Sequence, residues 1–173
     1  MSLEGPDDPE GELKSLLGQL ENRTEDGYHG DHAKRQLARL SVKYPNDVDI
    51  HFANAVYAAQ DNDASRATLH LDALFRITSV HPEGAILRAE LALKEGNLPL
   101  ALRVLDEQIR LVPDHPGLRE TLGSTFYFQG EYEASQDGLR RASRLGAPRW
   151  RVEHHLGLVA EGRRKNGRRS GAL

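Results

Sequence analysis

Histidine is the residue type in this sequence that could most readily carry metal chemistry. Its eight copies include three suggestive pairs: His29 with His32, His154 with His155, and His81 with His115. Adjacent residues on a helix point about 100° apart, so the second pair cannot chelate one ion together. The first pair lies across an expected turn, and each member of the third directly precedes a proline and is expected in a loop. We therefore predict no metal site and a surface or packing role for these side chains.

Catalytic chemistry is not indicated elsewhere in the sequence. No serine or threonine stands with a base and a second group to orient that base. No glycine-rich phosphate loop follows a strand, because no strand is apparent. Cysteine is absent, which excludes disulfides and thiolate metal ligands. We expect a protein that is not an enzyme and that uses no cofactor.

Charge is distributed unevenly along the chain. Residues 1–31 carry nine acidic side chains, whereas the last stretch is basic, with Arg163, Arg164, Lys165, Arg168 and Arg169. Such a tail could contact phosphates of nucleic acid or an anionic membrane. No aromatic residue interleaves with these cations for base stacking, so a nucleic-acid partner is unlikely and a solvated tail is preferred. Opposite potentials at the two ends leave weak end-to-end self-association open.

Composition indicates a soluble helical protein. The 173 residues are 38% hydrophobic and 28% charged, which suits much exposed helix surface. No apolar run approaches the roughly 20 residues that a membrane helix needs. The stretch from Met1 to Glu12 is polar and acidic, without the apolar core of a signal peptide. We expect a cytoplasmic protein of bacterial type, whose residues 1–9 are a disordered leader or a cloning scar.

A repeat with a period of about 34 residues organises the chain. Five columns keep this register: Ala33, Ala67, Ala101 and Ser135; Leu37, Leu71, Leu105 and Leu139; Ala55, Ala89, Gly123 and Gly157; Tyr28, Asn62, Gly96 and Gly130; Pro45, Ser79, Pro113 and Ala147. Small residues let two helices approach closely, and the leucines fill the space between them. Glycine and asparagine tolerate the left-handed conformation that ends a helix. The pattern predicts stacked helix hairpins.

Apolar spacing and breakers then place the helices. We predict helices over residues 10–25, 31–43, 48–60, 64–78, 82–95, 98–111, 116–128, 132–145 and 149–163. The last has one apolar face, with Trp150 and Val159, and is expected to cover the end of the stack. Residues 164–173 are predicted to be a disordered basic tail.

The repeated helix–turn–helix pattern resembles the tetratricopeptide repeat. The best matches are Leu122, Gly123, Phe126, Gly130 and Tyr132 in one repeat, and Ala89, Gly96, Ala101 and Pro113 in the preceding one. The fit is weaker where Glu21 and Tyr28 stand at small-residue and glycine positions, and where Asn54 replaces the expected leucine. The resemblance implies an all-α, right-handed superhelical solenoid over residues 10–163, with repeats at 14–47, 48–81, 82–115 and 116–149 and a cap at 150–163.

The resemblance also implies a binding surface. In this family the first helix of each repeat lines a concave groove that holds ligands. Carried onto this sequence, the groove residues are Phe52, Val56 and Gln60, then Ile86, Glu90 and Lys94, then Glu120, Ser124, Tyr127 and Phe128, with Asn22, Glu25 and Asp26 in the first repeat. This apolar and aromatic strip edged by acids suits an amphipathic helix or extended peptide with apolar anchors and some basic residues. Packing between repeats is the competing role for these side chains.

Function is therefore expected to be a protein–protein interaction scaffold. Some proteins of this family clamp the terminal carboxylate of chaperones, but Gly18, Ala53, Glu83 and Leu87 replace the Lys, Asn, Lys and Arg which that clamp requires. Two alternatives stay open: a secretion-type chaperone sheltering an apolar client segment, and the repeat region of a larger enzyme.

Overall fold

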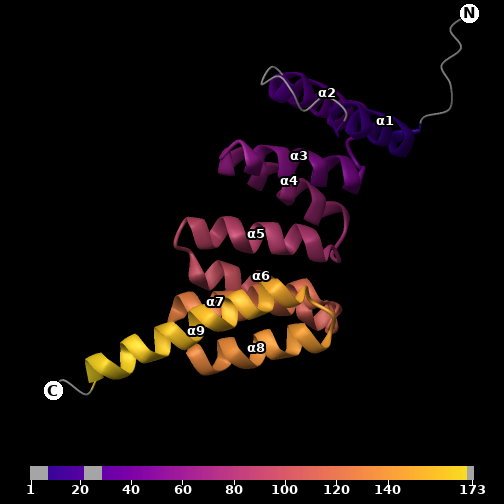
Figure 1. Cartoon of the computed structure of the whole chain (residues 1–173). Helices are drawn as coiled ribbons and strands as arrows, with labels where there is room; N and C mark the ends of the chain where they lie inside the picture. Colours follow the sequence, from indigo (N-terminus) through magenta and orange to yellow (C-terminus); the bar gives the residue numbers. More distant parts are fainter. Residues whose placement is uncertain (1–7, 22–28, 171–173) are drawn as a thin grey trace, which may run out of the picture. The chain divides into compact units, whose positions relative to one another are not determined.

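The structure, a computed structural model, describes residues 8–21 and 29–170. Within these ranges the chain is α-helical and contains no strand. The helices are α1 (Pro9–Glu21), α2 (His29–Lys43), α3 (Val48–Gln60), α4 (Ala64–Ile77), α5 (Pro82–Lys94), α6 (Leu98–Leu111), α7 (Pro116–Gln129), α8 (Tyr132–Arg144) and α9 (Arg149–Ser170) (Figure 1). The predicted boundaries agree within two residues except at the end of α9, while the predicted end of the first helix lies outside the described residues.

The chain divides into two compact units at a repeat boundary. Unit 1 (Met1–Ser79) contains α1 to α4, and unit 2 (Val80–Leu173) contains α5 to α9. The division falls two residues before the predicted boundary at residues 81 and 82. The sequence pattern predicts one repeat domain, because its columns continue across this point without a change of register.

The turns of three described hairpins have the predicted left-handed residue. Asn62, Gly96 and Gly130 have φ angles of 60°, 73° and 82°. Glycine adopts this region without steric cost, and asparagine is among the side chains that tolerate it best. The column therefore marks where each first helix ends, and Tyr28, its first member, lies outside the described residues.

A capping column that the sequence reading missed begins the helices α3, α5 and α7. Asp47, His81 and His115 stand one repeat period apart, and the side chain of each accepts a hydrogen bond from the backbone N–H three residues on, at 2.9, 2.9 and 3.2 Å. Asp63 and Asn97 cap α4 and α6 in the same way, at 3.0 and 3.2 Å. These contacts satisfy N–H groups that a helix start leaves without partners. The two histidines expected in loops are therefore helix N-caps.

Glu83 fixes the tautomer of one of these caps. His115 accepts through Nδ1, so its proton is on Nε2, which lies 3.3 Å from Glu83 Oε1. A hydrogen bond at one ring nitrogen thus sets the role of the other.

The small and leucine columns form the contacts between paired helices. All four leucines of the column, Leu37, Leu71, Leu105 and Leu139, are fully buried. The helices α7 and α8 approach closely at Gly123 on α7, where an added Cβ would lie 2.9 Å from the side chain and 3.1 Å from the backbone nitrogen of Leu139. A glycine is therefore required there, whereas a Cβ on Gly157 of α9 would meet no neighbouring atom within 4 Å.

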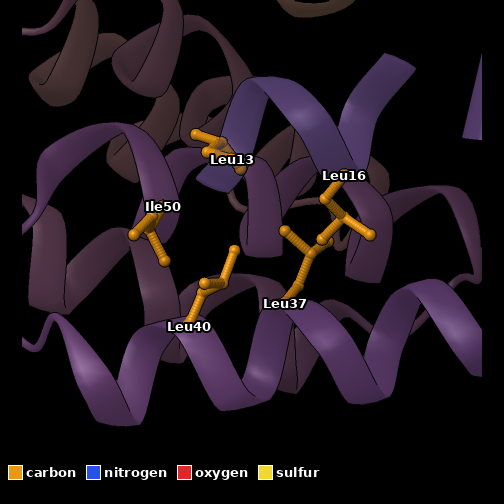
Figure 2. Packing of buried hydrophobic residues seen from close by; sticks show 5 residues of the cluster. All are labelled: Leu13, Leu16, Leu37, Leu40 and Ile50. Carbon is orange, nitrogen blue, oxygen red and sulfur yellow. The ribbon is translucent and has the colours of Figure 1, made fainter. Parts of the chain in front are cut away.

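One core cluster of unit 1 is built from three helices. Leu13 and Leu16 of α1, Leu37 and Leu40 of α2, and Ile50 of α3 are buried together (Figure 2). Burying aliphatic side chains of this size contributes about 1.5–3 kcal/mol each. The first hairpin thus packs on the second although its sequence departs from the repeat pattern.

Asn54, the other departure from the pattern, replaces apolar packing with hydrogen bonds. Its side chain is fully buried, and Nδ2 donates to the backbone oxygens of Leu37 and Ile50 at 3.1 and 2.9 Å. The first of these bonds ties α3 to α2. A polar side chain is tolerated at this leucine position because its amide hydrogens find carbonyl partners.

The helix α9 covers α8, as predicted for the cap. Its Val152 and Val159 are buried with Leu139 and Ala142 of α8. Gly162 continues this contact, because an added Cβ there would lie 2.6 Å from the ring of Tyr132.

The prediction of a disordered tail from residue 164 is wrong for the part that the structure describes, because α9 continues to Ser170 and its final turns extend past α8 (Figure 1). Arginine and lysine are good helix formers, and no proline interrupts them. Lys165 Nζ lies 2.7 Å from Glu161 Oε1 one turn earlier, and Arg163 lies 3.8 Å from Glu133 of α8. Residues 171–173 and most of the predicted leader, residues 1–7, lie outside the described residues.

None of the described helices combines the length and the apolar character that crossing a membrane would require.

Candidate binding grooves

Unit 2 contains a pocket between the helices α5, α7 and α9, which we call the unit 2 groove. Its volume is about 660 Å³. The helices α5, α7 and α9 and the residues that cap α7 line it: Ile86, Glu90, Leu93, His115, Gly117, Glu120, Thr121, Ser124, Phe128, Trp150, Arg151, His154 and His155. A pocket of this size can hold several side chains of a bound segment.

An ion pair between an exposed arginine and a buried acid joins α7 to α9 in this groove. The Glu120 side chain is only 5% exposed, and its carboxylate accepts hydrogen bonds from Arg151 Nε at 2.7 Å and Nη2 at 2.5 Å. This two-pronged geometry is the strong form of an arginine–carboxylate pair. The hydrogen bond with Glu120 raises the pKa of Arg151 above its ordinary value. The pair therefore fixes the start of α9 against α7.

His155 lies next to this ion pair. Its Nδ1 lies 3.6 Å from Glu120 Oε1 and 3.4 Å from Ser124 Oγ. Burial lowers the pKa of His155, and the nearby Glu120 opposes that effect only in part. A neutral imidazole at this place can donate or accept a hydrogen bond.

Glu90 is the second acid of the unit 2 groove and has a different environment. Its carboxylate makes no hydrogen bond or ion pair with any residue that the structure describes. Partial burial raises the pKa of Glu90, while the charges of Lys94 and Arg151 act in the opposite direction. The side chain itself is exposed at the pocket, and it lacks the direct partner that Glu120 has.

Two aromatic side chains stand exposed beside these acids. Phe128 of α7 is 64% exposed and Trp150 of α9 is 71% exposed. Large exposed aromatic side chains next to a pocket are typical anchors for a protein partner. The groove therefore combines an apolar rim with a charged floor.

Unit 1 has its own pocket, of about 690 Å³, which we call the unit 1 groove. The helices α1 and α3 line it with Glu10, Leu13, Lys14, Leu17, Gly18, Asp49, Phe52, Ala53, Val56 and Tyr57. Apolar and aromatic side chains dominate this lining, and Glu10, Lys14 and Asp49 supply the charges. Its chemistry is therefore more apolar than that of the unit 2 groove.

Most of the predicted groove residues line one of the two pockets. Phe52 and Val56 line the unit 1 groove, and Ile86, Glu90, Glu120, Ser124 and Phe128 line the unit 2 groove.

Three predicted residues lie elsewhere. Gln60 and Lys94 are exposed at the last positions of α3 and α5 and line neither pocket. Tyr127 packs against the α8–α9 core, with its ring centroid 6.0 Å from that of Tyr132 on α8. The first-repeat residues Asn22, Glu25 and Asp26 lie outside the described residues.

The contribution of α9 is the main feature that sequence reasoning missed. Trp150, Arg151, His154 and His155 were assigned to a cap, yet all four line the unit 2 groove. The signal was available, since His154 follows Glu120 by one repeat period. The small-residue column had already placed Gly157 of α9 in register with Gly123 of α7, so carrying the groove positions of α7 forward by the same step points to α9 as a further groove helix.

The histidines do not gather into a chelating cluster in the part of the chain that the structure describes. The rings of His154 and His155 are 5.7 Å apart and tilted by 53°. Among the described residues, no group of three His, Asp or Glu side chains could hold a metal ion.

Comparison with known proteins identifies the fold. No protein-family model and no curated protein matches this chain. Among solved structures, it is similar to MamA from residue 41 to its end, from Desulfovibrio magneticus RS-1, with a TM-score of 0.72 and 19% identity over 96% of this chain and 90% of that one. It is also similar to TTC0263, a TPR protein of Thermus thermophilus, with a TM-score of 0.72 and 17% identity over 88% of this chain and 81% of that one. For pilF of Pseudomonas aeruginosa the TM-score is 0.75 and the identity 16%, over 91% of this chain and 69% of that one.

At these identities the likeness concerns the fold. The predicted all-α solenoid of helix hairpins is confirmed, and so is the resemblance to tetratricopeptide repeat proteins at the level of the fold.

Proposed function

We propose that this protein is an interaction scaffold that binds a peptide or helix of a partner protein in the unit 1 and unit 2 grooves. The observation that carries the proposal is the unit 2 groove, where exposed Phe128 and Trp150 flank a floor containing the Glu120–Arg151 pair. Apolar anchors supply binding energy, and the fixed polar groups supply orientation and specificity.

The fold supports this function. Tetratricopeptide-type folds generally mediate protein–protein interactions and are typically non-enzymatic scaffolds. Helix hairpins held by buried leucines present the groove side chains on a rigid frame, which limits the entropy lost on binding. We propose that the unit 1 groove binds by the same principle, through Phe52 and Val56.

The proposal is tested by affinity capture with matched variants. Phe52→Glu and Phe128→Glu place a charge in the unit 1 and unit 2 grooves. Leu69→Glu, on α4, is the control, because Leu69 is 64% exposed, as Phe128 is, but lines neither groove. Partners captured by the unmodified chain would be compared quantitatively across the three variants, with circular dichroism confirming helix content.

We expect a partner that is retained by Leu69→Glu and lost with one of the groove variants. The segment that contacts the groove would then be mapped with overlapping synthetic peptides of that partner. Equal capture by all variants would exclude the grooves as the binding surface.

The apolar lining of the unit 1 groove favours one second candidate, a chaperone that shelters an apolar client segment. Such a client would be protected from proteolysis along an extended stretch. A scaffold would protect only the short segment that occupies the groove.

A further inference from the structure

Glu90 is the acid of the unit 2 groove that has no hydrogen-bond or ion-pair partner among the described residues. Glu120, the other acid in the lining, receives two hydrogen bonds from Arg151. Glu90 lines the same pocket and pairs with no described residue. An exposed carboxylate that lines a pocket without a partner is stabilised by an opposite charge that enters with a ligand.

We propose that the unit 2 groove takes a partner segment in which a lysine or arginine side chain pairs with Glu90 and an adjacent apolar residue packs on Phe128 and Trp150. The inference rests on the proposed function and adds to it the chemistry of the bound segment.

Charge complementarity distinguishes this occupant from an acidic segment. The cation in the groove, Arg151, already directs Nε and Nη2 at Glu120, so it is committed within the fold. An acidic ligand would have to compete with Glu120 for Arg151 and would approach Glu90 against like-charge repulsion. A basic ligand meets the unpaired carboxylate directly.

The aromatic rim favours the same occupant. A lysine or arginine brings a long aliphatic stem as well as a charge, and that stem can pack on apolar surface while the charged end reaches an acid. A guanidinium or ammonium group can also lie over an exposed aromatic face, and tryptophan is the most favourable ring for this contact. Phe128 and Trp150 are both exposed at this pocket.

The electrostatics of Glu90 agree with this geometry. Burial raises its pKa, with Glu120 adding to the increase and with Lys94 and Arg151 opposing it. A bound cation would favour the charged carboxylate and lower that pKa. Binding should therefore release a proton from Glu90 under conditions in which it is partly protonated.

The test uses peptides, because the partner is unidentified. Short random peptides displayed on phage would be selected on the full chain. One selected tryptophan-free sequence would then be synthesised with its basic residue and with a neutral replacement, citrulline for arginine or norleucine for lysine. Affinities would be read from the emission of Trp150, the single tryptophan of this chain, which lines the groove.

Three chains are compared with the unmodified one. Glu90→Gln removes the charge and keeps the side-chain shape. Glu95→Gln removes an exposed charge five residues away that does not line the groove. Phe128→Glu disrupts the aromatic rim.

We expect the selected peptides to carry a lysine or arginine near an apolar residue. Glu90→Gln should weaken the binding of the basic peptide about tenfold, as expected for one hydrogen-bonded charge pair. Glu90→Gln should leave the affinity for the neutral peptide unchanged, and Glu95→Gln should alter the affinity for neither peptide.

Two results would overturn the inference in different ways. If peptides lose binding with Phe128→Glu but lack basic residues, or are insensitive to Glu90→Gln, the pairing with Glu90 is wrong and the proposed function stands. If no selected peptide depends on Phe128, this groove is not the binding surface, and the pairing and the role proposed for the unit 2 groove both fail.

Discussion

Acid is expected to destabilise unit 1 through His70 of α4. This side chain is buried, and its Nδ1 lies 3.2 Å from Nδ1 of His51 on α3. His51 Nε2 lies 3.0 Å from the backbone oxygen of Pro45, which can only accept. The His51 proton is therefore on Nε2, and His70 donates to His51. Adding a proton to His70 puts a charge in this buried pair.

The size of the effect follows from the pKa of His70. Burial, then the charges of His51 and Arg66, lower this pKa from 6.5 to about 4. The unfolded imidazole takes up a proton below 6.5, whereas the folded one does so only near 4. Stability from this group is thus present above 6.5 and is lost as the pH falls toward 4. At about 1.4 kcal/mol per pH unit, the full loss is about 3 kcal/mol.

The assay is urea unfolding followed by circular dichroism between about pH 7 and about pH 4. His70→Gln should lack this component, so its unfolding free energy should fall less steeply with acid than that of the unmodified chain. His32→Gln, which changes an exposed histidine of unit 1, should follow the unmodified chain. An unchanged slope in His70→Gln, or an NMR titration of His70 near 6.5, would refute the reasoning.

Three further predictions concern unit 2. Arg151→Met should destabilise unit 2 by about 2–3 kcal/mol in urea unfolding, which is less than for a fully buried pair because the Arg151 side chain is 44% exposed. Adding Glu120→Gln should restore most of that loss. A double variant no more stable than the single one would contradict this. Leu105→Ala should cost about 2–5 kcal/mol by leaving a cavity at a fully buried position, and a loss below about 1 kcal/mol would show that the layer collapses around it. His81→Ala should cost about 1 kcal/mol, whereas His81→Asn should retain the cap, and equal losses in both would show that the cap contributes nothing.

The fold was predictable because its determinants are local and repeated. The leucine column and the left-handed residues at Asn62, Gly96 and Gly130 occupy the roles that their spacing predicts. Leucine at a fixed step and glycine at a turn each have few structural interpretations. Helix boundaries follow from them almost directly.

The candidate site was only partly predictable, because its decisive contacts join helices that are distant in sequence. Glu120 and Arg151 lie on different hairpins, and no local pattern shows that the arginine satisfies the acid. Tyr127 was predicted in the groove with packing as the competing role, and a helix position alone does not say which neighbour a large ring will reach. The helical end of α9 was missed because charged residues are compatible with both a helix and a disordered tail.

The capping column separates what a repeat must keep from what it can vary. Asp47, His81 and His115 perform one geometric task with two chemistries. A carboxylate accepts its hydrogen bond with no change of tautomer, whereas an imidazole that gains a second proton loses its acceptor. The start of α5 and of α7 thus depends on which ring nitrogen of a histidine carries the proton, whereas the start of α3 does not, so hairpins of one shape are capped by different chemistry.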